Sequence, residues 1–187
     1  MMQMIYINDN LYVGKGSERY CYRHPKNSNL CIKLDYKKVR KNKQNKNEYV
    51  YYKNIEKRIT SWKHIPYCYG WVSTNMGMGL AFDYIHDEQG APCKSVKYHL
   101  DRKTLTRQDL EAPLDELYSY LMEQKLIVND LNPSNLLCKF EGKNSFRLYL
   151  VDGLANRDFI KLADYVPTFA RAKINRHWNR LLVKLCY

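Results

Sequence analysis

The segment Ile127–Asp152 reads IVNDLNPSNLLCKFEGKNSFRLYLVD and combines two apolar runs with polar residues before and after them. The apolar runs are Leu136–Phe140 and Phe146–Val151, and the turn-forming residues Glu141–Asn144 lie between them, which predicts a β-hairpin. A hairpin brings its two ends together in space. We therefore expect three polar residues at those ends to converge, namely Asp130, Asn135 and Asp152.

Two carboxylates and one amide at a sheet edge supply a set of oxygen ligands. Hard divalent cations prefer such ligands, and a nearby carboxylate can also take the proton of a hydroxyl group. The segment therefore predicts a phosphoryl-transfer site.

These residues also resemble short motifs of protein kinases. Asp130 and Asn135 have the spacing of the protein-kinase catalytic loop, and Val151-Asp152-Gly153 resembles the metal-binding segment of kinase-like folds. Over nearly its full length the chain resembles the PhoP regulatory network protein YrbL family, a small kinase-like family. That resemblance includes SWKHIP at Ser61–Pro66 and DLNPSN at Asp130–Asn135. The resemblance to kinases in general is confined to short motifs.

The resemblance implies an α+β, two-lobed protein-kinase-like fold with a reduced C-terminal lobe. We expect one kinase-like domain over residues 1–187. Its N-lobe, about residues 1–85, would be mainly antiparallel sheet plus one helix, and its C-lobe, about residues 88–187, mainly helical with the catalytic hairpin. The length and the hydrophobic content of 45% suit such a folded domain.

The N-terminal half shows an alternating apolar pattern over residues 5–13, then Gly14-Lys15-Gly16-Ser17, then a second apolar stretch. A glycine-rich turn between strands can place main-chain N–H groups over phosphates. Alone, the two glycines predict an ordinary hairpin turn, since Arg19 stands where kinases have a third glycine. The strand that follows, Leu30–Leu34, contains Lys33. In protein kinases, too, a glycine-rich loop is followed along the sequence by a strand that contains a lysine.

A helix is predicted at about residues 47–59, with Glu48 on the same face as its apolar residues. A buried carboxylate needs a partner, and Lys33 is the candidate. Glu48 could instead cap the helix start. Strands are predicted at residues 69–74 and 79–85, and the resemblance implies that Asp83–Ile85 contact adenine through the main chain.

Two helices are predicted in the C-terminal half. One begins at Pro113 and reaches about Gln124, because proline favours the first helical position. The other is a basic amphipathic helix at residues 174–185. Its apolar side would consist of Ile174, Trp178, Leu181, Leu182 and Leu185 and its basic side of Arg176, Arg180 and Lys184.

The resemblance implies ATP and magnesium as cofactors, with a role for each site residue. Asp130 would accept the proton of the acceptor hydroxyl, and Asn135 and Asp152 would hold magnesium. Lys33, oriented by Glu48, would hold the α- and β-phosphates. The backbone of Gly14–Gly16 and the side chain of Ser17 would cover the phosphates. The chain departs from the kinase pattern at three further positions: Val128 and Asn129 replace His-Arg, and Gly153 replaces an aromatic residue.

The net charge of +12 is concentrated in two regions. Residues 33–58 carry ten lysines and arginines against three acids, and residues 157–187 carry seven against two. A basic surface favours an anionic partner, such as a nucleotide, a phosphorylated acceptor or an acidic membrane surface touched peripherally. A solvated basic face without any partner is the other interpretation.

Six cysteines lack C-x2-C spacing, which favours reduced thiols over zinc or disulfides. The N-terminus has no signal-peptide pattern, and no apolar run approaches membrane-spanning length, so we expect a cytoplasmic protein.

Three functions remain open: a kinase acting on an unidentified hydroxyl acceptor, a pseudokinase acting as a regulatory module in a PhoP-type stress or envelope response, and a nucleic-acid-binding protein. Retention of Asp130, Asn135 and Asp152 favours the first. Nucleic acid ranks last, because two acids would repel phosphates and no nucleic-acid motif is present. The sequence leaves the acceptor and the oligomeric state open.

Overall fold

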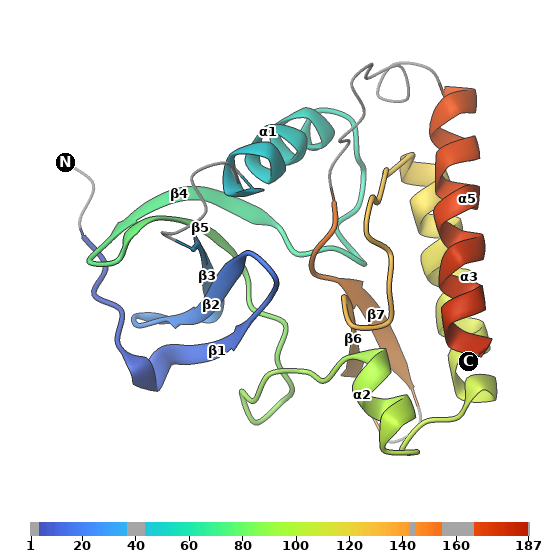
Figure 1. The fold of residues 1–187 in the computed structure, drawn as a ribbon, viewed down its shortest axis with the longest axis horizontal. Helices are drawn as coiled ribbons and strands as arrows, with labels where there is room; N and C mark the ends of the chain where they lie inside the picture. The colour runs from blue at the N-terminus through green and yellow to red at the C-terminus, as the bar shows by residue number, and fades with distance from the viewer. Residues whose placement is uncertain (1–3, 37–43, 143–144, 155–166, 187) are drawn as a thin grey trace. The chain divides into compact units, whose positions relative to one another are not determined.

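The computed structural model describes residues 4–36, 44–142, 145–154 and 167–186 (Figure 1). The chain divides into two compact units. The first contains residues 1–54 and 66–92, and the second contains residues 55–65 and 93–187. The division of one kinase-like domain near residues 85–88 stays a prediction.

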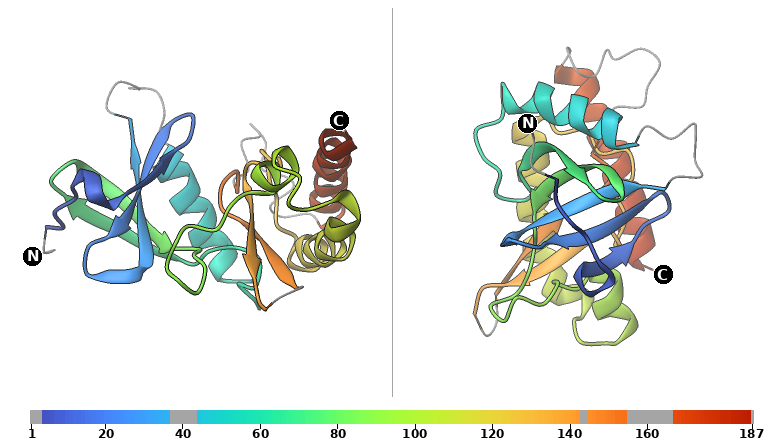
Figure 2. Two further views of the ribbon diagram at one scale, coloured as in Figure 1. Left: turned by 90° about the horizontal axis from the view of Figure 1, so that it is seen from below. Right: turned by 90° about the vertical axis from the view of Figure 1, so that its left-hand side faces the viewer.

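The first unit contains a five-stranded antiparallel sheet in the order β1-β2-β3-β5-β4 (Figure 1). Helix α1 lies across one face of this sheet (Figure 2). The elements of the unit are the 3-10 turn η1 (Asp9–Leu11), β1 (Tyr12–Lys15), β2 (Arg19–His24), β3 (Asn27–Asp35), α1 (Gln44–Glu56), β4 (Cys68–Thr74) and β5 (Gly77–Asp83).

The strand predicted over residues 5–13 is only partly present. Ile5 forms an isolated bridge with Thr74, and the regular strand begins at Tyr12. Between them the chain makes the turn η1, because the side chain of Asn8 accepts a hydrogen bond from the Asn10 N–H at 3.1 Å. Such a local side-chain bond competes with strand pairing.

The two faces of the sheet have different roles, because successive strand residues point to opposite sides. Tyr22, Ile32 and Leu34 point to one face and form a core cluster with Ile7. Lys33, between two of these residues, points to the face that α1 covers, where its ammonium reaches a glutamate of that helix. Aromatic pairs hold α1 on that face: Tyr52 with Phe82 and Tyr49 with Trp71, at ring-centroid distances of 5.3 and 5.7 Å.

The second unit combines helices with a two-stranded hairpin. Its elements are α2 (Val96–Asp101), α3 (Arg107–Gln124), β6 (Leu136–Phe140), β7 (Phe146–Leu150) and α5 (Pro167–Cys186). The hairpin agrees with the apolar pattern of the sequence, and its register pairs Leu136 with Leu150 and Phe140 with Phe146. Helix α3 contacts both β7 and α5, so it joins the hairpin to the C-terminal helix (Figure 1).

The predicted start of the helix before the hairpin was wrong. Helix α3 begins at Arg107, and Pro113 lies inside it. Thr106 and Asp109 form a capping box, in which each side chain accepts a hydrogen bond from the main chain of the other. This box satisfies N–H groups that a helix start leaves unpaired. It therefore nucleates the helix upstream, and Pro113 removes only one hydrogen bond of the first turns.

The last residues of α1 and the segment after it, residues 55–65, belong to the second unit. The main-chain N–H of Leu150 donates to the carbonyl of His64 at 2.8 Å, and the His64 Nδ1 lies 2.8 Å from the Leu148 carbonyl oxygen. Burial lowers the pKa of His64, so the neutral imidazole is favoured. The Tyr120 hydroxyl donates to the Ser61 carbonyl at 2.7 Å.

Helix α5 buries most, but not all, of its predicted apolar side. Its buried residues include Ile174, Trp178, Leu181 and Leu185. Leu182 was placed on that side, yet 40% of it is exposed, because it lies beside Leu181 around the helix and turns away from α3. No helix among the described residues is long and apolar enough to span a membrane.

Candidate functional site

Helix α1 brings Glu48 to the lysine of β3. The Lys33 Nζ lies 3.4 Å from the Glu48 Oε1, and both side chains are buried. Lys33 also lies over the ring of Phe82, with its Nζ 4.3 Å from the centroid. Glu48 is within the helix rather than at its start, so its carboxylate serves the lysine and not the helix dipole.

The glycine-rich residues form a tight β1–β2 turn. Gly14 lies in β1, and a Cβ added at this position would meet nothing within 4 Å. The Gly16 N–H donates to the Arg19 carbonyl at 2.8 Å, and the Gly16 carbonyl accepts from the Tyr36 hydroxyl at 2.6 Å. Ser17 is exposed at the tip. The Gly16 N–H is thus used within the turn, and Ser17 is the exposed residue at its tip.

The segment predicted to contact adenine follows β5. The side chain of Asp83 is held by the Tyr67 N–H at 2.7 Å and by the Tyr69 hydroxyl at 2.9 Å. The next residue, Tyr84, donates its N–H to the Asn29 carbonyl at 2.7 Å. Beyond Tyr84 the chain forms an isolated antiparallel bridge between His86 and Pro92, and the Asp87 N–H donates to the Ala91 carbonyl at 2.9 Å. The contact of Asp83–Ile85 with adenine stays a prediction.

In the second unit, the loop before the hairpin orients Asp130. The Asn135 Nδ2 donates to both the carbonyl and the Oδ2 of Asp130, at 3.1 and 3.2 Å. The Asn132 Nδ2 donates to the Asp130 Oδ1 at 2.8 Å. Asp130 itself is exposed. Two amides thus fix an accessible carboxylate, and the sequence pattern gave no sign of the role of Asn132.

The segment after the hairpin lies against that loop. The Val151 N–H donates to the Asn135 carbonyl at 3.0 Å, and the Asn129 N–H donates to the Gly153 carbonyl at 2.9 Å. Gly153 has a φ of +85°, and a Cβ on it would be 2.6 Å from the Asp130 carbonyl oxygen. The close approach of the two backbones places Asp152, one residue earlier, next to the Asp130–Asn135 loop.

The three polar residues supply a donor set that suits magnesium. Asn135 turns its amide nitrogen toward Asp130, and no hydrogen bond to its Oδ1 is found among the described residues. One oxygen of Asp152 accepts the Gly153 N–H at 2.7 Å. Carboxylate and amide oxygens are hard ligands, as magnesium prefers. No group of three or more histidine, cysteine or acidic residues that could hold a metal is found in the described ranges.

Two residues of the first unit extend the lysine–glutamate pair. Arg19 contacts Glu48 through its Nη1, and the same nitrogen donates to the Asn45 Oδ1 at 3.0 Å. Both residues are buried. In the sequence, Arg19 stands out only because it replaces the third glycine of the kinase pattern. Asn45 lies in a basic, polar run, and no sequence pattern indicates that it is buried.

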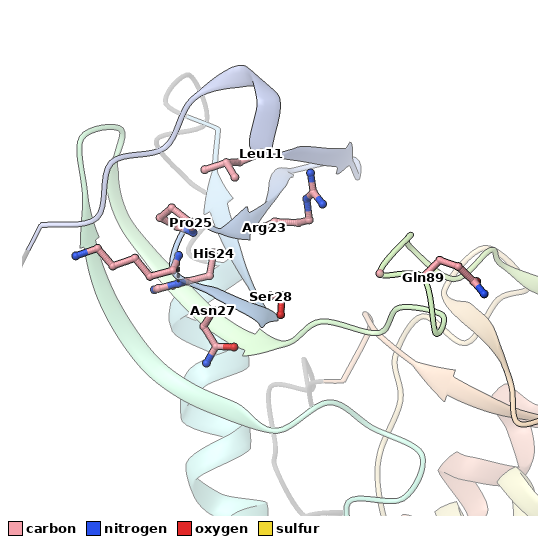
Figure 3. A pocket seen from close by; sticks show the side chains of 9 residues that line it. Leu11, Arg23, His24, Pro25, Asn27, Ser28 and Gln89 are labelled. Atoms are coloured by element: carbon pink, nitrogen blue, oxygen red, sulfur yellow. Dashed lines mark hydrogen bonds between the residues drawn. The ribbon is translucent and has the colours of Figure 1, made fainter.

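A pocket of about 590 Å³ lies in the first unit but shares no residue with the predicted site. It is at the turn between β2 and β3, with Arg23, His24, Ser28 and Gln89 around it (Figure 3). Arg19 pairs with Asp35 at the other end of this hairpin, so the pocket and the lysine–glutamate cluster are at opposite ends of β2.

Comparison with known proteins places the fold and the family. A family described as PhoP regulatory network protein YrbL matches residues 5–186. Two relatives, each named an uncharacterized protein YrbL, come from Escherichia coli (strain K12) and Shigella flexneri. Each is 27% identical over 184 residues, which cover 97% of this chain and 88% of the relative.

Two similar solved structures are of the Mycobacterium tuberculosis PknI kinase domain, one of them a cysteine-to-alanine mutant. Their TM-scores are 0.53 and 0.52 at 16% identity, over 78% of this chain. This chain covers 59% of the length of those kinase domains. The likeness confirms a mixed α+β, protein-kinase-like fold. The sequence match over nearly all of its residues shows that the chain belongs to the PhoP regulatory network protein YrbL family.

Proposed function

We propose that the protein is an ATP- and magnesium-dependent phosphotransferase that acts on a hydroxyl acceptor. The observation that carries this proposal is the apposition of the Asp130–Asn135 loop with the Asp152–Gly153 backbone. It gathers an exposed, amide-held carboxylate and two further oxygen ligands in one place. The kinase-like fold and the lysine–glutamate pair of the first unit agree with it.

Each residue has one task in this proposal. Lys33 binds the α- and β-phosphates, and Glu48 keeps the Lys33 ammonium on the face of the sheet that α1 covers. The exposed tip at Ser17 covers the phosphates, and the main chain of Asp83–Ile85 binds adenine. Phosphoryl transfer requires mainly positioning and neutralisation of charge, so these binding roles account for most of the catalysis.

The remaining residues act on the acceptor and the metal. Asp130 takes the proton of the attacking hydroxyl, and the amides of Asn132 and Asn135 hold its carboxylate in place. Asn135 and Asp152 would hold magnesium, which neutralises charge on the transferred phosphate when bound. Without a cation, the Asp152 carboxylate would repel the nucleotide phosphates.

Binding of ATP is the first test. The protein should bind ATP more tightly with magnesium than without it, as measured by calorimetric titration. Lys33→Met should weaken this binding by about tenfold or more, because a hydrogen bond to a charged group contributes roughly 1.5–3 kcal/mol. The exposed Lys26 of the same unit offers a matched control, and Lys26→Met should bind as the wild type does. Absence of any response to millimolar nucleotide would refute the proposal.

A pseudokinase is the second candidate, and one observation favours it. Arg19 replaces the third glycine of the loop and is buried against Glu48, a departure from the phosphate loops of active kinases. In this alternative the protein binds nucleotide and acts as a regulatory module without turnover. The two candidates agree on nucleotide binding, so only a measurement of turnover separates them.

We also propose that the exposed side of α5 binds an anionic membrane surface peripherally. It carries Arg176, Arg180 and Lys184, all exposed, and interleaves them with Leu182 and Val183, which are 40% and 57% exposed. Cations beside exposed apolar side chains suit an interface with acidic headgroups. The acceptor hydroxyl would then belong to an envelope-related molecule.

Vesicle sedimentation tests this surface. The triple variant Arg176→Gln/Arg180→Gln/Lys184→Gln should lose binding to anionic vesicles, because each cation contributes about 1 kcal/mol at such a surface. The control variant neutralises three other exposed cations of the same unit, Arg102, Lys103 and Arg107, and should bind as the wild type does. Equal loss in both variants, or equal binding of the wild type to nucleic acid, would instead indicate a nonspecific effect of charge.

A further inference from the structure

Arg19 is a buried arginine at the start of β2, with an exposed fraction of 4%. Arginine is almost never fully buried unless it is paired. In this chain it occupies the position at which the kinase pattern has a glycine, so its side chain enters a region that the pattern leaves empty. Its partners therefore show what the substitution does.

The partners form one buried network around Glu48. The Arg19 Nη1 contacts the Glu48 Oε2, and the Lys33 Nζ reaches the other oxygen, Oε1, at 3.4 Å. Asn45 joins the network from both sides: its Oδ1 accepts from Arg19 at 3.0 Å, and its Nδ2 donates to the Lys33 carbonyl at 2.9 Å. One carboxylate is thus shared between two cations, and an amide fixes the spacing of the strands that carry them.

The two cations do not hold the glutamate equally. The lysine contact of 3.4 Å is near the limit for a hydrogen bond, and the lysine is also engaged with the face of Phe82. The arginine contact is direct and joins a second hydrogen bond of the same nitrogen to Asn45. A guanidinium is planar and permanently charged, which suits a buried anchor better than a flexible ammonium does.

We propose that Arg19 is a positioning residue that holds Glu48, so that the carboxylate keeps its place when Lys33 turns its donors to nucleotide phosphates. The proposal rests on the proposed nucleotide binding and assigns different roles to the two cations that contact Glu48. Arg19 anchors the glutamate, and the glutamate in turn aims the lysine. Removal of Arg19 would leave Lys33 as the main cation for a buried carboxylate and would draw it away from the phosphates.

The anchoring is tested by double-mutant cycles of unfolding in urea. Arg19→Met and Lys33→Met are each combined with Glu48→Gln, and the coupling of each pair is taken from the equilibrium constants of unfolding. We expect Arg19 and Glu48 to be coupled more strongly than Lys33 and Glu48. An equal or larger coupling of Lys33 with Glu48 would overturn the proposal. Should Arg19→Met fail to fold, Arg19→Gln completes the same cycle.

The functional consequence is tested by calorimetric titration with MgATP. Arg19→Met should weaken binding roughly 5–150-fold, the usual range of coupling between two sites, and Arg19→Lys should restore only part of it, because an ammonium keeps the charge but lacks the planar guanidinium. In a Glu48→Gln background the same change should have no further effect, which a merely structural arginine would not show. An undiminished effect in that background, or wild-type affinity in Arg19→Met, contradicts the proposal.

The two experiments separate this inference from the proposed function. A wild-type protein that does not bind MgATP refutes nucleotide binding, and the unfolding cycles then decide alone whether Arg19 anchors Glu48. A wild-type protein that binds, combined with a dominant coupling between Lys33 and Glu48, refutes only the role of Arg19.

Discussion

Replacement of Asp130 by asparagine is expected to lower turnover by roughly 10²–10⁴-fold, the usual contribution of a positioned general acid or base. Both carboxylate oxygens of Asp130 accept amide hydrogens, from Asn132 and Asn135, while the residue itself remains exposed. An asparagine has the same shape but cannot take a proton. ATP binding should therefore survive the change, because the phosphate-binding residues lie elsewhere in the chain.

The measurement is consumption of ATP across a panel of hydroxyl compounds, with calorimetry as the check on binding. Ser134→Ala is the matched control, because Ser134 is exposed in the same loop and its main-chain N–H, which the change retains, donates to the Asn132 Oδ1 at 2.9 Å. It should retain wild-type turnover. If wild type and Asp130→Asn consume ATP at the same negligible rate on every compound, the pseudokinase alternative is the better description.

The second large effect is expected from Gly153→Ala. Gly153 has a φ of +85°, a region that residues with a side chain rarely adopt, which alone destabilises a protein by roughly 1–3 kcal/mol. In addition, the new Cβ would lie 2.6 Å from the Asp130 carbonyl oxygen, which is main chain and cannot swing away. The Asp130 loop and the Asp152 segment should therefore move apart, and magnesium should no longer tighten ATP binding.

Gly142→Ala separates the two causes. Gly142 also has a positive φ, +109°, but nothing lies within 4 Å of a Cβ built on it. In a urea titration, the Gly142→Ala variant should show only the loss of stability that comes from the backbone conformation. Its ATP binding should still depend on magnesium. Equal stability of the two variants, with magnesium dependence unchanged in Gly153→Ala, would show that the close approach does not organise the site.

Several features could be predicted from the sequence because they depend on local patterns. The hairpin Leu136–Phe140 and Phe146–Leu150 follows from two apolar runs around a turn signal. The convergence of the Asp130–Asn135 loop with Asp152 then follows from hairpin geometry. The contact of Lys33 with Glu48 could be anticipated because a carboxylate on an apolar helix face must find a cation. The roles of these residues in binding and catalysis stay predictions.

Other features depend on which residues meet across the fold, and here local pattern was insufficient. Pro113 is followed by acidic residues, which is typical of a helix start. Helix α3 nevertheless starts earlier, because Thr106 and Asp109 form a capping box there. Nothing in the local pattern around SWKHIP indicates that the Leu150 N–H of β7 donates to the His64 carbonyl.

Local pattern alone therefore determined the hairpin, the converging loop and the lysine–glutamate contact, since each depends on alternation, spacing or a single unpaired charge. Only the tertiary structure decided that Arg19 is an internal cation, that Asn45 joins β3 to α1, and that Gly153 has no room for a side chain. The physical reason is common to all three. Burial and close approach arise when distant segments pack together, and a residue's neighbours along the chain do not contain that information.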